Sequence, residues 1–199
     1  MIRALITLLL ATTSLFAVER PKGFLTINWG ASPEEAKRVM QARPGVKFPT
    51  DADDYKFELT GGTFAGQAVE KWILEFPERK FASATVIIKS EGDAPTKYKE
   101  FRTQLVAKYG SATTDKKMKG DKKAGGERAP SLGTQSIWKF NPNLRDKSNV
   151  SITCELANGG QGGVLALKYV NETLVAAAAA TTAAGANPLP PAGVKKDEL

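Results

Sequence analysis

Carboxylates are the residue type through which this 199-residue chain could do chemistry unaided. The chain contains no histidine and a single cysteine, so serine and cysteine nucleophiles lack their usual base and zinc lacks its commonest ligand. Paired carboxylates, in contrast, hydrolyse glycosides without histidine. Four glutamates fall in segments with a strand-like sequence: Glu58, Glu70, Glu75 and Glu155.

Glu70 stands out among these because it shares the alternation of Trp72, Leu74 and Phe76 along one expected strand. A position at a strand end or a sheet edge accounts for a glutamate there equally well. The sequence therefore predicts a protein that is not an enzyme, and a histidine-free hydrolase using carboxylates is the alternative.

Other candidate sites are expected to be structural. Cys154 continues the apolar alternation of Val150 and Ile152, which predicts a buried, inert thiol. The acidic run at Asp51, Asp53 and Asp54 lacks the sixth-position glycine of a calcium loop, and Gly62 stands where its twelfth-position glutamate is needed. The glycine-rich stretch 158–163 has no helix after it, so it predicts a turn and not a phosphate-binding loop. We expect neither a cofactor nor a bound metal.

The strongest charge cluster lies between Asp115 and Arg128. Six basic residues there face three acidic ones, a net charge of +3 out of +7 for the chain. The segment has no aromatic residue, which argues against nucleic acid as the partner. It is expected to be either a solvated loop or a contact for an anionic surface such as lipid headgroups, cell-wall polymer or an acidic protein. The candidate contact residues are Lys116, Lys117, Lys119, Lys122, Lys123 and Arg128.

Two helices are expected to position these residues. The first begins at Ser32, which can cap it, with Pro33 at the first helical position and Glu35 where a capping-box acid belongs. It ends before Pro44. The second spans about 96–109, with apolar residues at spacings of three and four: Tyr98, Phe101, Leu105 and Tyr109.

Alternating apolar residues predict the strands, and glycine-rich turns separate several of them. A short strand is expected at 25–29, and longer ones at 56–64, 68–76, 81–90, 135–140, 150–157 and 164–170. The fold class is α+β: two helix-strand-strand-strand units, at about 24–90 and 96–171, form antiparallel sheet with two helices packed on one face. Trp29, Trp72 and Trp138 are expected to anchor the core.

The two ends of the chain differ in composition from its middle. Residues 1–17 combine an early arginine, an apolar stretch and a final alanine, which predicts a signal peptide for export. Residues 18–175 are expected to form one soluble domain with no transmembrane segment, and the Ala- and Pro-rich residues 176–199 a disordered tail. The only cysteine is Cys154, far from the predicted cleavage site, so we do not expect a lipoprotein.

Residues 24–37, with their Trp29-Gly30 pair and a Ser-x-Glu-Glu helix start, resemble small exported bacterial domains that are mostly uncharacterised. The likeness continues at 105–110 and 137–139 and covers about 24–171. The doubled layout is also similar to secreted beta-lactamase inhibitor proteins and, more distantly, to small lipoproteins of outer-membrane assembly. This resemblance implies the α+β fold and binding of other proteins, and it assigns no site residues.

The last four residues, Lys196 to Leu199, spell an endoplasmic-reticulum retrieval signal, with which Asn149 and Asn171 would be glycosylation acceptors. The bacterial resemblance favours the periplasm or secretion, and the endoplasmic-reticulum lumen is the alternative. The function we expect is a non-enzymatic binding, scaffold or inhibitor-like module. Its partner would be another exported protein or an anionic envelope surface, and the contact surface would be a face of the sheet or the loop 115–128.

Overall fold

The computed structural model describes residues 20–50, 53–119, 131–157 and 163–185. Its main sheet has the spatial order β3-β4-β6-β7-β11-β10-β9-β8, and β5 pairs with β6 beside that path. The strands are β3 (Val46–Lys47), β4 (Lys56–Gly61), β5 (Thr63–Phe64), β6 (Gln67–Glu75), β7 (Ser83–Ile88), β8 (Thr114–Lys119), β9 (Ser131–Phe140), β10 (Val150–Ala157) and β11 (Val164–Asn171). The helices are α1 (Pro33–Gln41), α2 (Ala94–Tyr109) and α3 (Glu172–Gly185), with a short 3₁₀ turn at Pro77–Arg79.

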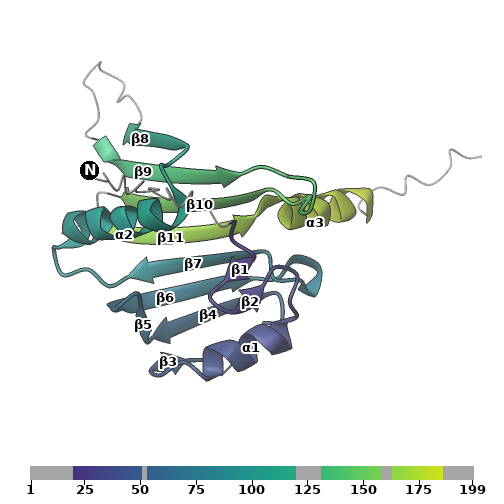
Figure 1. Ribbon diagram of the computed structural model, residues 1–199. Helices are drawn as coiled ribbons and strands as arrows, with labels where there is room; N and C mark the ends of the chain where they lie inside the picture. The colour runs from purple at the N-terminus through teal and green to yellow at the C-terminus, as the bar shows by residue number, and fades with distance from the viewer. Residues whose placement is uncertain (1–19, 51–52, 120–130, 158–162, 186–199) are drawn as a thin grey trace, which may run out of the picture.

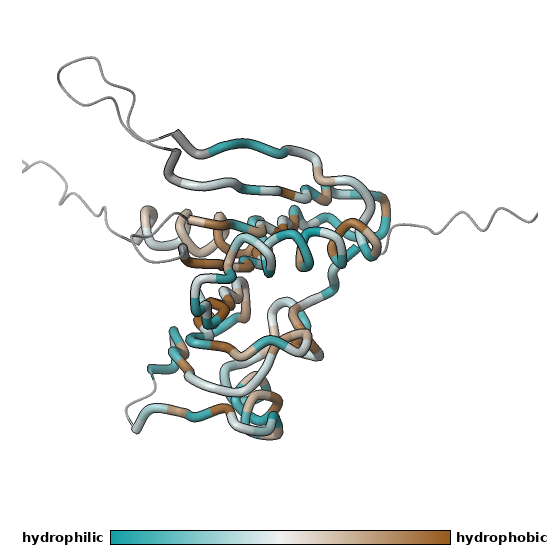
Figure 2. Tube along the Cα trace, turned by 90° about the vertical axis from the view of Figure 1, so that its left-hand side faces the viewer, coloured by the Kyte–Doolittle hydropathy of each residue, from teal (hydrophilic) through white to brown (hydrophobic). Residues whose placement is uncertain are grey.

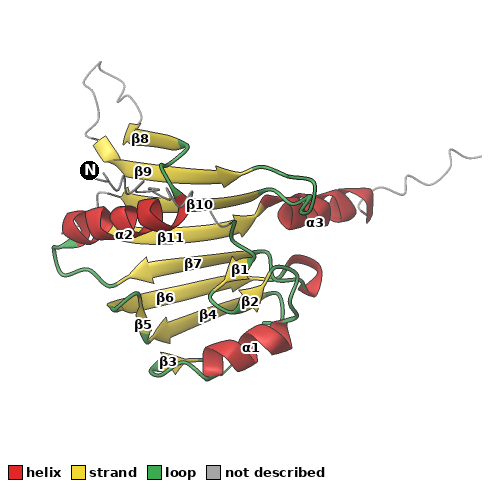
Figure 3. Ribbon diagram, in the orientation of Figure 1, coloured by secondary structure: helices red, strands yellow, loops and turns green. Residues whose placement is uncertain are grey.

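The predicted α+β class is confirmed. In Figure 1, α1, α2 and the small hairpin of β1 (Gly23–Phe24) and β2 (Ile27–Asn28) lie on the same side of the sheet. The last strands of the two units, β7 and β11, pair antiparallel at its centre, with Thr85 opposite Lys168. This pairing joins the two halves into one continuous sheet, which Figure 3 shows in yellow.

The helix starts follow from local chemistry. The Ser32 hydroxyl accepts a hydrogen bond from the Glu35 N–H at 3.2 Å, and Pro33 occupies the first turn, as predicted. Ala36 and Met40 of α1 are fully buried. Helix α2 begins two residues earlier than expected and ends at Gly110, whose φ of 75° few other residues adopt.

The core fills the space between the sheet and the elements that cover it. Trp72 and Trp138 are buried there, and each indole N–H donates to a backbone carbonyl at 2.8 Å, of Gly61 and Gly110 respectively. Trp29 is half-buried and stacks on Phe81 with the ring centroids 5.2 Å apart. The expected anchoring by tryptophan is thus met, and Figure 2 shows the hydrophobic segments gathered in the middle of the molecule.

The N-terminal strand prediction was wrong in one respect. Residues 25–29 do not form a single strand, because Leu25 has a φ of 55° and turns the chain between β1 and β2. Phe24 pairs with Ile27 in this hairpin, and both side chains are buried. Alternation alone cannot distinguish one short strand from two halves of a tight hairpin.

Two segments predicted to be irregular form regular elements. Residues 114–119 form β8, paired with β9, where a loop was expected from 115 onward. A lysine-rich edge strand has weak intrinsic β-propensity, and the backbone bonds to its neighbour stabilise it. Helix α3 occupies 172–185, overlapping the predicted tail, because alanine favours the helix even where little is buried. Residues 186–199 lie outside the described part.

No helix among the described residues is both long enough and apolar enough to cross a membrane.

Candidate functional site

The two faces of the main sheet differ in their surroundings. Side chains of successive residues alternate between the faces, so those pointing away from α1 and α2 form rows across the strands. One row consists of register partners Thr114, Ile137, Thr153, Lys168, Thr85, Ile73 and Glu58, and the next of Lys116, Gln135, Glu155, Ala166, Ile87, Lys71 and Thr60. None of these side chains is buried. We call these two rows the open face.

β-branched residues on β6, β7, β10 and β9 lie on both sides of Lys168, which stands on the middle strand of the open face, β11. Ile73, Ile87 and Ile137 are only partly exposed, which leaves apolar surface between polar neighbours. At the β4 border, Glu58 accepts from Lys56 at 2.5 Å and Lys71 at 3.2 Å. These hydrogen bonds, from Lys56 first, lower the pKa of Glu58 below its ordinary value.

Two lysines lie on the rest of the open face, Lys168 on its middle strand β11 and Lys116 on its β8 border. Glu155 accepts from the neutral amide of Gln135 at 2.9 Å. Within the described ranges, Lys116 and Lys168 form no ion pair with any acidic side chain. Partly exposed isoleucines beside ammonium groups that form no ion pair suit a partner that offers both apolar and acidic groups.

Strand β8 places part of the predicted anionic-partner contact on this surface. Lys116 and Lys117 are exposed, and as neighbours in a strand they point to opposite faces, so Lys116 alone of the two lies on the open face. Lys119 is the last residue of β8. The remaining candidates, Lys122, Lys123 and Arg128, lie outside the described residues.

A polar cluster that the sequence did not reveal anchors β8 to α2. The Arg102 guanidinium donates to the Asp115 carboxylate at 2.7 Å and to the Ser136 hydroxyl at 3.1 Å. Ser136 in turn donates to Asp115 and shares a 2.8 Å hydrogen bond with the Tyr98 hydroxyl. The Arg102 hydrogen bond, more than that of Ser136, lowers the pKa of Asp115. The only advance signal was the position of Tyr98 on the apolar stripe of α2.

Cys154 lies one strand away from this cluster, opposite Ser136 in register. Its predicted burial is confirmed, with 0% of the residue exposed. Burial raises the pKa of the thiol to about 12, so it is protonated at neutral pH and is a poor nucleophile. Its low reactivity toward thiol reagents stays a prediction.

The candidate carboxylates do not converge. Glu70 is exposed, because the register shifts between Val69 and Lys71 and this bulge breaks the alternation that the sequence predicted. Strands β11 and β7 separate β10, which carries Glu155, from β6. Three interstrand spacings amount to roughly 14 Å, beyond the ~9.5 Å limit of paired glycosidase carboxyls.

Glu58 and Glu75 lie on neighbouring strands, but neither is arranged as a general acid. Glu75 accepts a hydrogen bond from the Ser83 hydroxyl. The lowered pKa of Glu58 is the opposite of what protonation of a leaving group requires. The geometry therefore gives no support to the hydrolase alternative at these two residues.

The acidic residues near position 53 form hydrogen bonds and ion pairs with other residues of this chain. Asp53 accepts from the Tyr55 N–H at 2.9 Å, and Asp54 pairs with Arg79 at 2.5 Å. Arg79 also pairs with Glu34 at 2.5 Å, which ties this loop to the start of α1. Asp51 lies outside the described residues. In the described part of the chain, no group of three or more histidine, cysteine, aspartate or glutamate side chains is placed to hold a metal ion.

Asn171 is a poor glycan acceptor in this fold. It is 3% exposed, and its side-chain oxygen accepts from the Leu174 N–H at 3.1 Å, which caps α3. Asn149, the other sequon, is exposed. The signal at 1–17 and the four C-terminal residues lie outside the described ranges.

Comparison with known proteins adds no family to this geometry. No protein-family model matches the chain, and neither a curated protein nor a solved structure is significantly similar to it. The functional argument therefore rests on the residues themselves.

Proposed function

We propose that this chain is an exported, non-enzymatic binding module, of scaffold or inhibitor type, that holds another exported protein on its open face. The observation that carries the proposal is the contrast between the two faces of one sheet. The side facing α1 and α2 buries large side chains such as Trp72 and Trp138, whereas no side chain in the two rows of the open face is buried. The adjacent row on the same side of the sheet as the open face buries the small Ser83 and Ser151. Antiparallel sheets commonly leave such a face to solvent, and its partly exposed isoleucines are what make this one a contact surface.

The size of the open face suits a protein partner better than a small molecule. It extends over seven strands from β8 to β4, which corresponds to roughly 29 Å at the usual interstrand spacing. Its two rows lie two residues apart along each strand and together span about 14 Å, so the surface is on the order of 400 Å², about half of the ~800 Å² that each partner contributes to a standard interface.

Its charge points to the acidic character of that partner. Lys116 and Lys168 form no ion pair with any described acidic side chain, so their charges are free to pair across an interface. Ile73 and Ile87 on one side of Lys168, and Ile137 on the other, would supply apolar contacts to such an interface. Residues 1–17 support export, because their pattern is that of a cleavable signal.

Site-directed photo-crosslinking in the native cell tests the proposal. A photoreactive side chain at Thr85, in the middle of the open face, is expected to give a discrete adduct with an acidic exported protein. The same group at Lys99, which is exposed on α2, is the matched control and should give none. Equal labelling at both positions, or none at Thr85, would overturn the choice of surface.

A second variant tests whether that adduct reflects binding. Thr85→Arg places a long cation among the isoleucines and should abolish the adduct formed from a photoreactive group at Ile137, while Lys99→Glu should not. Sequencing the mature N-terminus after cell fractionation tests export separately. An uncleaved, cytosolic protein would contradict the compartment that the proposal assigns.

A further inference from the structure

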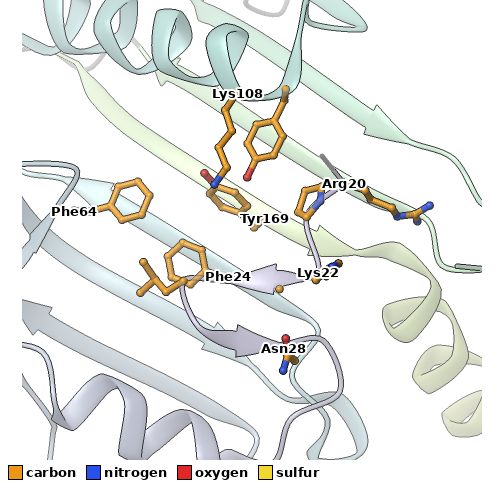
Figure 4. Close-up of a pocket in the computed structure, with 11 residues that line it drawn as sticks. Arg20, Lys22, Phe24, Asn28, Phe64, Lys108 and Tyr169 are labelled. Atoms are coloured by element: carbon orange, nitrogen blue, oxygen red, sulfur yellow. The ribbon is translucent and has the colours of Figure 1, made fainter. Parts of the chain in front are cut away.

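A pocket opens on the other side of the sheet, at the seam between the two helix-and-strand units. It has a volume of about 280 Å³. Its walls come from residues 20–25 with the β1–β2 hairpin, from the last turn of α2 and from β11, as Figure 4 shows. The proposed protein-binding surface lies on the opposite face, so this pocket is independent of it.

Aromatic rings form much of the pocket. Phe24, Phe64, Tyr109 and Tyr169 all line it. The Phe24 ring lies 5.1 Å from that of Tyr169 and 5.7 Å from that of Phe64, measured between centroids. Rings packed in this way are held in place by their neighbours and offer a preformed apolar surface.

The charged groups of the pocket are basic, and none of its lining residues is acidic. Arg20 points away from the interior in Figure 4 and pairs with Asp146 at 3.1 Å. Lys108 points inward toward Tyr169, and its ammonium nitrogen lies 5.1 Å from the centroid of the Tyr109 ring. Among the residues that the structure describes, Lys22 and Lys108 have no acidic partner. These two lysines are the charges available to a ligand.

Tyr169 adds a hydroxyl donor beside Lys108. Burial raises the pKa of Tyr169, so its hydroxyl keeps its proton at neutral pH. The C-terminal end of α2 carries a partial negative charge that opposes an anion, and Lys108, in the last turn, offsets it. The pocket therefore presents an ammonium group and a phenolic O–H side by side, both of which hydrogen-bond a carboxylate.

We propose that this pocket binds a carboxylate carried on a short apolar chain. The carboxylate lies between the Lys108 ammonium and the Tyr169 hydroxyl, and the apolar chain lies against the Phe24 and Phe64 rings. A free alkyl carboxylate and the C-terminal carboxylate of a peptide with an apolar last residue share this chemistry.

Calorimetric titration of the purified protein, in the form that the expressing host processes, tests the site. Octanoate and N-acetylleucine represent the two sources of carboxylate, and octanamide is the uncharged control. At least one carboxylate should bind saturably, and the stronger of the two identifies the source. Lys108→Gln and Tyr169→Phe should each weaken it about tenfold, the loss expected for one charge-assisted hydrogen bond. Lys99→Gln, an exposed lysine on the same helix, should leave it unchanged.

Three results would overturn the proposal. The first is the absence of saturable carboxylate binding, and the second is octanamide binding as tightly as octanoate. The third is carboxylate binding that neither Lys108→Gln nor Tyr169→Phe weakens, provided thermal unfolding shows both variants folded. Glu19 immediately precedes the lining segment in the sequence, so the titration is repeated with the Glu19→Gln variant. Binding seen only in that variant would make the chain's own carboxylate the occupant and would also overturn the proposal.

Discussion

Replacing Ser136 by alanine removes one hydroxyl from the polar cluster that fastens β8 to α2. Ser136 is buried, and its oxygen contacts three partners: Tyr98, Arg102 and Asp115. The substitution deletes only this oxygen from the side chain, so the loss of hydrogen bonding dominates its effect.

The magnitude follows from what is left unpaired. The Tyr98 hydroxyl lies within the α2–sheet interface and loses its described partner at 2.8 Å. Asp115 and Arg102 are half exposed and keep their direct pair at 2.7 Å, so water compensates part of their loss. One buried unsatisfied hydroxyl costs about 1–3 kcal/mol. We expect Ser136→Ala to lower the free energy of unfolding by about 2 kcal/mol.

Urea unfolding followed by tryptophan fluorescence measures this loss, since Trp138 lies two residues away on the same strand. Hydrogen exchange should also speed up first in β8 and in the part of β9 that pairs with it. Thr153→Ala, on the open face of the neighbouring strand, is the matched control and should change stability by less than about 0.5 kcal/mol.

The reasoning fails if Ser136→Ala and Thr153→Ala cost the same, or if Ser136→Ala costs less than about 0.5 kcal/mol. A double-mutant cycle with Asp115→Asn gives a second criterion. Residues in one hydrogen-bonded network should show a coupling of about 0.5–3 kcal/mol, and additive effects would mean that the cluster does not act as a unit.

Three further outcomes are expected. Arg102 lowers the pKa of Asp115, so the contribution of Asp115 to stability is present above its ordinary pKa and is lost as the pH falls through the lowered pKa. Acid titration should therefore destabilise the wild type more than the Asp115→Asn variant. Parallel curves of stability against pH for the two proteins would contradict this. Cys154 should react with a thiol reagent only slowly in the native protein and rapidly in urea, and a native rate like that of a free thiol would contradict its burial. Asn171→Ala removes the hydrogen bond that caps the Leu174 N–H and should lower the free energy of unfolding by about 1 kcal/mol. The helical signal of α3 in far-ultraviolet circular dichroism should fall as well. Unchanged ellipticity and stability would show that the cap is dispensable.

Most regular elements were predictable because they are encoded locally. Ser32 and Pro33 mark the start of α1 by side-chain and backbone chemistry within one turn. The stripe from Tyr98 to Tyr109 marks α2 by its period, and alternation marks the long strands. The predictions failed where pairing with another strand outweighs the local sequence pattern. Strand β8 depends on its pairing with β9, and the bulge at Glu70 depends on how β6 pairs with β7.

The candidate sites were less predictable than the fold. The lysines of 115–128 form a charge run that is visible in the sequence. Only the strand register shows that Lys116 of β8, Lys168 of β11 and Ile87 of β7 lie on the same face of the sheet. The cluster at Ser136 and the pocket at Lys108 join residues that are far apart in the sequence. No spacing rule connects them.

By itself the sequence determined the α+β class, the start of α1, the apolar stripes and the lack of histidine, because each depends on residue types alone or on residues within a few positions. The tertiary structure decided which sheet face is left open, where Lys116 and Lys168 stand on it, and that Phe24, Lys108 and Tyr169 share one pocket. The physical reason is that strand order and register are set by long-range backbone pairing and core packing.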